Sequence, residues 1–313
     1  MRIFLAGATG AVGRSLVPML IEAGHEVVGT TRSAAKLEAL ASAGAEPVVM
    51  DGLDEGSVQR AVLDARPDVV IHQLTALSGS INTRKFDEEF ALTNQLRTVG
   101  TDHLLAAARS AGVRRFLVQS FTGWTNRRSG SAIKDEHDPL DPTPTAASRR
   151  TLAAIRHLEE TVGSATDLEG LCLRYGVLYG PGTAFAEGGS LLDRVRKRRL
   201  PVVGGGTGVW SFVHVDDAAR ATVHSLDHGL PGLYNIVDDQ PAPVAEWLPG
   251  LAEALGAKPP MKLPASVARP MVGEHGVSLM TMIRGSSNAK ARADLGWVPV
   301  YPSWREGFRH GLG

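Results

Sequence analysis

The chain has 313 residues, with 43% hydrophobic and 21% charged residues, a composition typical of a globular protein. Lysine plus arginine equals aspartate plus glutamate, at 33 each, so net charge draws the molecule neither to nucleic acid nor to an anionic membrane. No apolar run approaches the roughly 18 residues of a membrane span, and a single cysteine, Cys172, excludes an internal disulfide. Because the first predicted strand begins directly after Met1, with no room for a signal peptide, these features predict a cytoplasmic protein without a nucleic-acid or membrane partner.

The first thirteen residues carry the clearest motif. A short apolar run, residues 3–6, leads into a segment with three glycines and then into an amphipathic stretch, residues 14–23. Strand, glycine turn and helix in this order hold the pyrophosphate of a dinucleotide, because glycines let the backbone approach the phosphates and the helix start offers free N–H groups. A glycine-rich turn without a ligand is the alternative. The predicted cofactor-binding residues of this loop are Gly7, Thr9, Gly10, Ala11, Val12 and Gly13.

The end of the second predicted strand, residues 25–30, bears on which dinucleotide is bound. An NAD site usually has an acidic residue there that accepts from the ribose hydroxyls, and this sequence has none. Arg32 follows the strand instead, and Lys36 lies one turn into the next helix. A guanidinium at this place suits the 2′-phosphate of NADP, so NADP(H) is predicted over NAD(H). The alternative is a solvated arginine at a strand end.

Apolar strands continue to alternate with helices, at residues 46–50, 68–74 and 115–120, which predicts an α/β fold with a doubly wound parallel sheet of the Rossmann type. A long helix is predicted over residues 86–111, with Asn94 and Arg97 about one turn apart. Because the strand ends line the crevice that holds the cofactor, the further predicted cofactor residues are Asp51, Gly52, Leu74, Thr75, Ala76 and Asn94. Asp51 is expected either to accept from the adenine amino group or to cap the helix that starts near Glu55.

Several motifs then follow one another in a family order: GATGAVG at Gly7–Gly13, Asp51 after the third strand, LRYGVLYGPG at Leu173–Gly182 and FVHVDDAA at Phe212–Ala219. The ordered set resembles the extended short-chain dehydrogenases/reductases, the sugar-nucleotide epimerase/dehydratase group. The resemblance implies a Rossmann domain over 1–175 plus about 208–240, and a smaller, mostly C-terminal substrate lobe over about 176–207 and 241–313. It also implies a homodimer formed through helices 86–111 and 146–162.

The same resemblance implies a catalytic Tyr-x-x-x-Lys on the helix after the fifth strand, with a serine or threonine at the strand end. No tyrosine of this sequence has a lysine four residues later. Counting back from Glu159 places Thr151 and Ile155 where the family has tyrosine and lysine, and counting back from Glu160 places Leu152 and Arg156 there; neither alternative supplies the acid. Phe121 takes the place of the serine, between Ser120 and Thr122.

Residues near the end of the fifth strand are therefore candidates to replace the missing catalytic pair. Ser120 and Thr122 are candidates to polarise a carbonyl, and Tyr175 is a candidate for contact with cofactor or substrate. The polar segment 126–145 offers Lys134, Asp135, Glu136 and His137 as acids or bases if it folds over the nicotinamide, a solvated loop being the alternative. His224 and His228 lie four residues apart, but no third ligand accompanies them, so no metal site is predicted.

The sequence thus predicts an NADP-dependent oxidoreductase, a reductase or epimerase-like enzyme, with a non-standard active site. It would act on a carbonyl or hydroxyl of a small metabolite or sugar-type substrate. Two alternatives stay open: a non-redox cyclase, lyase or isomerase on the same fold, and a catalytically inactive protein that senses NADP(H).

Overall fold

A computed structural model describes residues 1–77 and 81–313. Its centre is a seven-stranded sheet of order β12-β7-β5-β4-β1-β2-β3, in which every neighbouring pair is parallel. The strands are β1 (Arg2–Ala6), β2 (Glu26–Thr31), β3 (Glu46–Val49), β4 (Val69–His72), β5 (Arg115–Phe121), β7 (Glu169–Tyr175) and β12 (Gly232–Ile236). This arrangement confirms the predicted Rossmann-type α/β fold.

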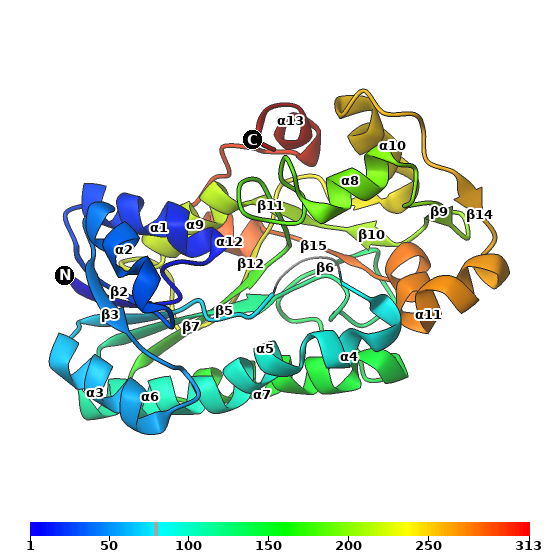
Figure 1. Cartoon of the computed structure of the whole chain (residues 1–313). Coiled ribbons are helices and arrows are strands. Elements are labelled where there is room, and N and C mark those ends of the chain that lie inside the picture. The colour runs from blue at the N-terminus through cyan, green and yellow to red at the C-terminus, as the bar shows by residue number, and fades with distance from the viewer. Residues whose placement is uncertain (78–80) are drawn as a thin grey trace.

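Helices cover both faces of the sheet, as Figure 1 shows. On one face α1 (Ala11–Glu22) packs against α9 (Val215–His224). On the other, α3 (Glu55–Ala65) packs against α6 (Thr101–Ser110), with α7 (Arg149–Gly163) beside them. Short helix α2 (Leu37–Ser42) follows β2.

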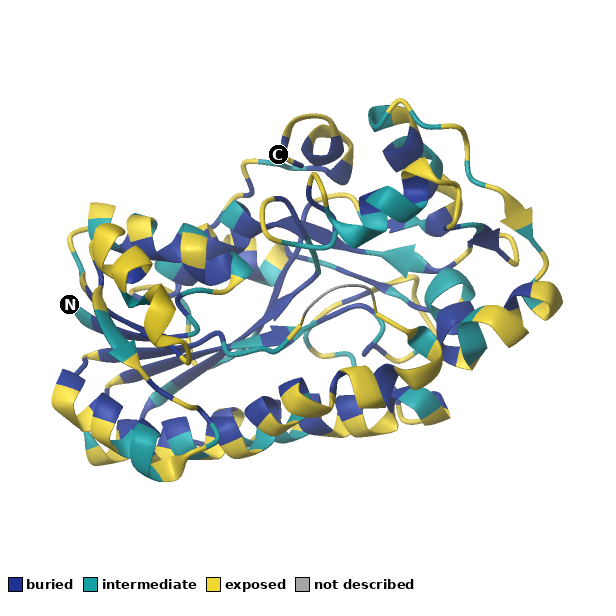
Figure 2. Ribbon diagram, in the orientation of Figure 1, coloured by how far each residue is buried: buried dark blue, intermediate teal, exposed yellow. Residues whose placement is uncertain are grey.

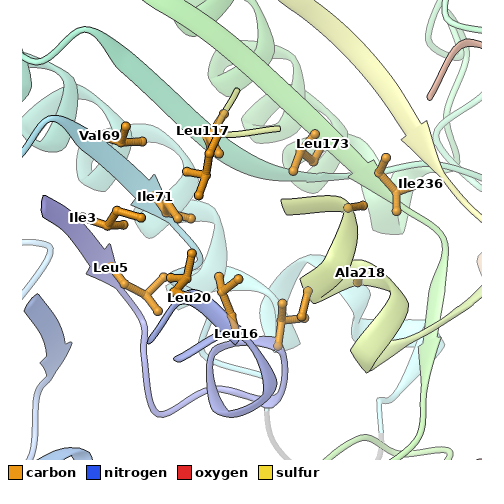
Figure 3. Packing of buried hydrophobic residues seen from close by; sticks show 14 of the residues in the cluster. Ile3, Leu5, Leu16, Leu20, Val69, Ile71, Leu117, Leu173, Ala218 and Ile236 are labelled. Atoms are coloured by element: carbon orange, nitrogen blue, oxygen red, sulfur yellow. The ribbon is translucent and has the colours of Figure 1, made fainter. Parts of the chain in front are cut away.

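Strand alternation divides the buried side chains between the two faces. Ile3 and Leu5 of β1 pack with Leu16 and Leu20 of α1, as Figure 3 shows, whereas Phe4 belongs to the core under α3 and α6. Burying each such side chain contributes roughly 1.5–3 kcal/mol, so the two cores together fix the sheet and its covering helices.

The predicted long helix over residues 86–111 is interrupted. It consists of α4 (Phe86–Glu89), α5 (Ala91–Gln95), a π turn labelled η3 (Leu96–Gly100), and α6. Phe90 leaves helical geometry, with φ −92° and ψ 3°. Gly100 lies close to Gly52, because a Cβ built on Gly100 would be 3.5 Å from the carbonyl oxygen of Gly52.

A second lobe lies at the right of Figure 1. Its helices are α8 (Ser190–Arg196), α10 (Val244–Ala254), α11 (Ala265–Thr281) and α13 (Trp304–His310). Two-stranded pairs join them: β8 (Val177–Tyr179) with β11 (Phe212–His214), β9 (Val202–Val203) with β14 (Lys262–Leu263), β10 (Val209–Trp210) with β13 (Ala242–Pro243), and β6 (Ile133–Lys134) with β15 (Gly285–Ser286). The core of this lobe is aromatic, with Tyr179, Phe212, Trp247 and Phe308 buried together.

The chain returns to the sheet near its end. Helix α12 (Ala289–Leu295) and Trp297 belong to the same buried cluster as α9. The Asp217 carboxylate accepts from the backbone N–H groups of Val300 and Tyr301, at 2.8 and 2.9 Å, which fastens this segment to α9. Part of segment 241–313, which the sequence assigned to the substrate lobe, therefore packs on the sheet.

Figure 2 shows buried residues running through both parts of the molecule. None of the helices in the described ranges is long and apolar enough to cross a membrane.

Candidate active site

The glycine loop between β1 and α1 is held by close backbone contacts. Gly7 has φ +97°, and a Cβ on it would lie 2.8 Å from the carbonyl oxygen of Gln73 at the end of β4. A Cβ on Gly13 would lie 2.4 Å from the Gly7 oxygen. The Gly7 N–H donates to Thr30 Oγ1 at 3.2 Å. Only glycine fits at Gly7 and Gly13, so the turn is fixed against its neighbouring strands.

The outer side of the same loop is open. Gly10 is exposed and begins α1, whose first turn has no side-chain cap and no acidic residue. The first N–H groups of the helix are therefore available to an anion. The Val12 side chain is buried in the core, which leaves only its backbone for a ligand. Gly182 of the Tyr-Gly-Pro-Gly turn approaches Ala11, with 3.6 Å between the Ala11 Cα and a Cβ built on Gly182.

The end of β2 presents two free cations. The side chains of Arg32 and Lys36 are exposed, and within the described chain neither makes a hydrogen bond or an ion pair. After β3, the carboxylate of Asp51 is exposed and accepts from the Leu53 N–H at 3.0 Å. The capping alternative for Asp51 is wrong, because Asp54 caps α3 by accepting from the Ser57 N–H at 2.8 Å.

Residues after β3 and β4 complete this edge of the sheet. Gly52 lies against Leu74, whose Cδ1 would be 2.6 Å from a Cβ on Gly52. Leu74, Thr75 and Ala76 are half-buried, and Ala76 N–H donates to Thr93 Oγ1 at 3.0 Å. Because the strands are parallel and the order reverses between β1 and β4, the glycine loop lies at the topological switch point, with these residues beside it. The open loop, the uncapped helix and the free cations fit a dinucleotide.

Tyr175 does not take part in this crevice. Its side chain is 0% exposed, accepts from Gln73 Nε2 at 2.9 Å and lies 2.6 Å from Thr222 Oγ1. Burial raises the pKa of Tyr175 to about 12. Strand alternation turns this residue into the core beneath α1 and α9, and this position does not support the prediction that Tyr175 contacts cofactor or substrate.

Ser120 and Thr122 are also buried, and both are already hydrogen-bonded. Ser120 Oγ donates to Glu159 Oε1 at 2.7 Å. Thr122 Oγ1 lies 2.6 Å from Ser286 Oγ. These interactions do not support the prediction that the two hydroxyls polarise a carbonyl. Phe121, between them in β5, is the half-buried residue of this strand end.

The start of α7 holds Thr151, one of the residues that the resemblance places at the tyrosine position. Thr151 is buried, its hydroxyl donates to Asp87 at 2.7 Å, and it accepts from Asn94 Nδ2 at 3.0 Å. Asp87 also accepts from the backbone N–H groups of Arg150 and Thr151, at 3.0 and 2.8 Å. Thr151 is therefore part of the cap of α7. Ile155, at the lysine position, is buried and apolar.

The segment 126–145 is fastened to the rest of the chain. Lys134 is buried and its ammonium bonds Asp138 at 2.9 Å, while β6 pairs with β15. Glu136 accepts from the Asn235 N–H of β12 at 2.7 Å. Asp135 and His137 are exposed, and Asp135 accepts from the His137 N–H. The interactions of Lys134 and Glu136 do not support the hypothesis that these two act as acid or base.

An aromatic cluster lies beyond the strand ends, and sequence reasoning found only part of it. Phe86 lies 5.3 Å from Trp124 and 4.3 Å from His275 of α11, between ring centres. Phe121 lies 6.2 Å from Trp124. His275 Nδ1 is 3.1 Å from Thr145 Oγ1, and burial lowers the pKa of His275 to about 4. His275 was missed because it lies some 150 residues along the chain from Trp124, and no local pattern marks it.

Comparisons with known proteins agree with this geometry. A family model described as the NAD dependent epimerase/dehydratase family matches residues 3–236. A 3-diazoavenalumate denitrifying reductase from Streptomyces sp is 45% identical over 310 residues, which cover 98% of this chain and 99% of that protein.

Two solved structures are similar over the whole chain. The UDP-glucose 4-epimerase of Thermus thermophilus in complex with NAD has a TM-score of 0.75 at 26% identity, covering 100% of this chain and 98% of that one. A human epimerase family protein with NADPH has a TM-score of 0.77 at 20% identity, covering 100% and 99%, which shows the shared fold. Relatives named as reductases and epimerases indicate an oxidoreductase-type enzyme with a nicotinamide cofactor. The matched segment, the sheet topology and the glycine loop together show that this chain belongs to the NAD-dependent epimerase/dehydratase family.

Proposed function

We propose that the protein is an NADPH-dependent reductase that delivers hydride to a diazo compound and releases dinitrogen. One observation carries the proposal: Thr151 stands at the tyrosine position with its proton bonded to Asp87, in a chain 45% identical to a denitrifying reductase. Among the described residues, no tyrosine stands at this place as the acid for carbonyl reduction, and a reaction that releases dinitrogen does not need one there.

The chemistry explains why the acid is dispensable. Hydride addition to a ketone leaves negative charge on oxygen, which a nearby acid must protonate. A diazo substrate instead loses dinitrogen, which leaves with the electron pair of the C–N bond while the hydride pair forms the new C–H bond. A neutral diazo compound takes up one further proton, which water can supply. When bound, reduced nicotinamide supplies the hydride.

No other phenol takes the place of the missing tyrosine in the described chain. Tyr179 and Tyr234 are 0% exposed like Tyr175, and burial raises the pKa of each. Tyr301 lies against His214, 4.4 Å between ring centres, in the C-terminal part of the chain. The aromatic faces of Phe121 and Trp124, both half-buried, support a flat unsaturated substrate more than a sugar.

The preference for NADPH is supported by charge. Arg32 and Lys36 are exposed at the end of β2 with no acidic residue in the strand end, and a guanidinium binds a 2′-phosphate by charge-assisted hydrogen bonds.

The experiment is a substrate comparison with purified protein. NADPH oxidation and gas release are measured with 3-diazoavenalumate carrying ¹⁵N in the diazo group, and NADPH oxidation alone with a panel of ketones and aldehydes. We expect one labelled dinitrogen for each NADPH oxidised and little carbonyl reduction. Reduction of carbonyls without release of dinitrogen from the diazo compound would contradict the proposal and point to an acid elsewhere in the site.

A further inference from the structure

Arg97 is a buried cation whose side chain has no hydrogen-bond partner among residues 1–77 and 81–313. It lies in the π turn η3 and is 6% exposed. None of its guanidinium nitrogens makes a hydrogen bond to another part of the described chain, and Nη1 is sealed from solvent. A guanidinium has five N–H donors, and leaving buried donors unpaired is costly. A side chain retained in this state indicates a partner that is not part of the protein.

The charge of Arg97 is not balanced by its surroundings. Burial lowers the pKa of Arg97 to about 10, and the charge of Glu159 opposes that shift only in part. Arg174 already binds both Glu159 oxygens, at 2.7 Å each. His72, the other titratable neighbour, is kept neutral because burial lowers its pKa to about 4. The ring of Phe90 lies 5.8 Å from the guanidinium carbon, the range of a cation–π contact. Among the described residues, the positive charge of Arg97 is therefore not paired with a carboxylate.

The π turn places Arg97 beside the predicted cofactor crevice. His72 Nε2, at the end of β4, lies 3.3 Å from the Leu96 carbonyl oxygen, and Gly100 approaches the Gly52 carbonyl after β3. The turn also packs against α7, which carries the apolar Ile155. π turns inside helices occur frequently at functional sites.

A second unpartnered atom lies one turn earlier. Asn94 donates its amide hydrogen to Thr151, but its Oδ1 is sealed from solvent without a donor. Arg97 and Asn94 thus offer a buried donor and a buried acceptor on successive turns. A ligand oxygen that carries or develops negative charge, next to a hydroxyl, would satisfy both.

We propose that Arg97, with Asn94, binds an oxygen of the ligand in this crevice. The oxygen belongs either to a ribose hydroxyl of the dinucleotide or to the hydride acceptor. Arg97 stabilises negative charge there but gives up no proton, since a guanidinium stays ionised near neutral pH. The inference rests on the proposed function only in placing a dinucleotide and a hydride acceptor in this crevice.

The test uses Arg97→Met, which keeps the length of the side chain and removes its charge, and Arg97→Lys, which keeps a charge. Arg60→Met, on the exposed face of α3, is the matched control. Affinity for NADPH and NADP⁺ is measured by fluorescence titration, turnover with 3-diazoavenalumate by NADPH oxidation, and stability by thermal melting. Because an unpaired buried charge is removed, Arg97→Met should keep or raise the melting temperature.

A rise of about tenfold or more in the Kd of both nucleotides for Arg97→Met supports binding to the cofactor ribose. An unchanged Kd with a fall in kcat of about a hundredfold, partly restored by Arg97→Lys, supports binding to the hydride acceptor. The inference is overturned if Kd and kcat stay within about twofold of wild type, or if only the melting temperature falls. Should wild type fail to reduce the diazo compound, the proposed function fails, and the nucleotide Kd alone then decides the role of Arg97.

Discussion

His72 and His275 lie in different parts of the molecule, and burial lowers the pKa of each from 6.5 to about 4. As the pH falls, the two histidines are protonated near pH 6.5 in the unfolded chain but only near pH 4 in the folded chain. The free energy of unfolding is therefore unaffected by these two groups above pH 6.5. It decreases as the pH falls from 6.5 towards 4, by up to about 3 kcal/mol for each histidine.

This predicts a steep acid limb in a plot of unfolding free energy against pH. Urea unfolding at several values between pH 4 and pH 7 measures it. His275→Asn should reduce the slope by about half, because one of the two groups is gone. The variant His137→Asn, on the exposed loop, should leave the slope as it is; an equal change in both variants would contradict the assignment.

We propose that Arg32 sets the preference for NADPH over NADH. Arg32→Asp removes the cation and places a carboxylate where it would repel a 2′-phosphate and accept from ribose hydroxyls. We expect the Kd for NADPH to rise about tenfold or more while the Kd for NADH falls or stays. Titration of both cofactors checks this, and an unchanged Kd for both would show that Arg32 does not bind the 2′-phosphate.

The start of α7 depends on an interaction between elements. Asp87 of α4 accepts from two backbone N–H groups of α7 and from the Thr151 hydroxyl. Thr151→Val removes one hydrogen bond to Asp87 and one from Asn94, so stability should fall by about 1–2 kcal/mol. In the proposed reaction the proton of Thr151 is not transferred, so turnover should stay within a few-fold of wild type. Loss of turnover in a variant that still folds would make Thr151 a catalytic group.

Among the secondary-structure elements, the strands of the sheet were predicted well from the sequence, for identifiable reasons. The runs at residues 3–6 and 69–71 are apolar throughout, and strands buried on both faces need such runs. The glycine loop was predictable because Gly7 and Gly13 meet local steric demands.

Other features depended on contacts that no local pattern shows. The π turn at 96–100 arises in residues that suit an ordinary helix, so only its packing on Gly52 and α7 reveals it. The surroundings of Ser120 and Thr122 could not be predicted, because polar residues lie on both faces of the sheet at the end of β5. The sequence therefore did not show which face is buried. Their partners, Glu159 and Ser286, come from elements distant in sequence.

For the whole molecule we propose a homodimer through the helices of residues 86–111 and 146–162, that is α4, α5, α6 and α7 at the bottom of Figure 1, with α3 outside the interface. Leu92 and Val99, on that series of helices, are 37% and 42% exposed. Beside them, a surface groove of about 530 Å³ is lined by the loop 141–144 and by Leu152, Ala153 and two arginines of α7. Exposed apolar side chains on adjoining helices favour a helical interface.

Light scattering of the purified protein checks the homodimer. The wild type should have about twice the chain mass of 33.2 kDa. Val99→Glu should shift the protein towards the monomer, whereas Leu63→Glu, exposed on α3, should not. A wild type that is monomeric at working concentration would contradict the proposal.

We propose that this site delivers hydride to a carbon that loses dinitrogen, without a tyrosine acid. The decisive experiment uses NADPH carrying deuterium at nicotinamide C4, in separate preparations for each face, and 3-diazoavenalumate in ordinary water. We expect one preparation to place a single deuterium on the carbon that carried nitrogen, with one dinitrogen released. A denitrified product without deuterium from either preparation, or no consumption of the diazo compound, would contradict it.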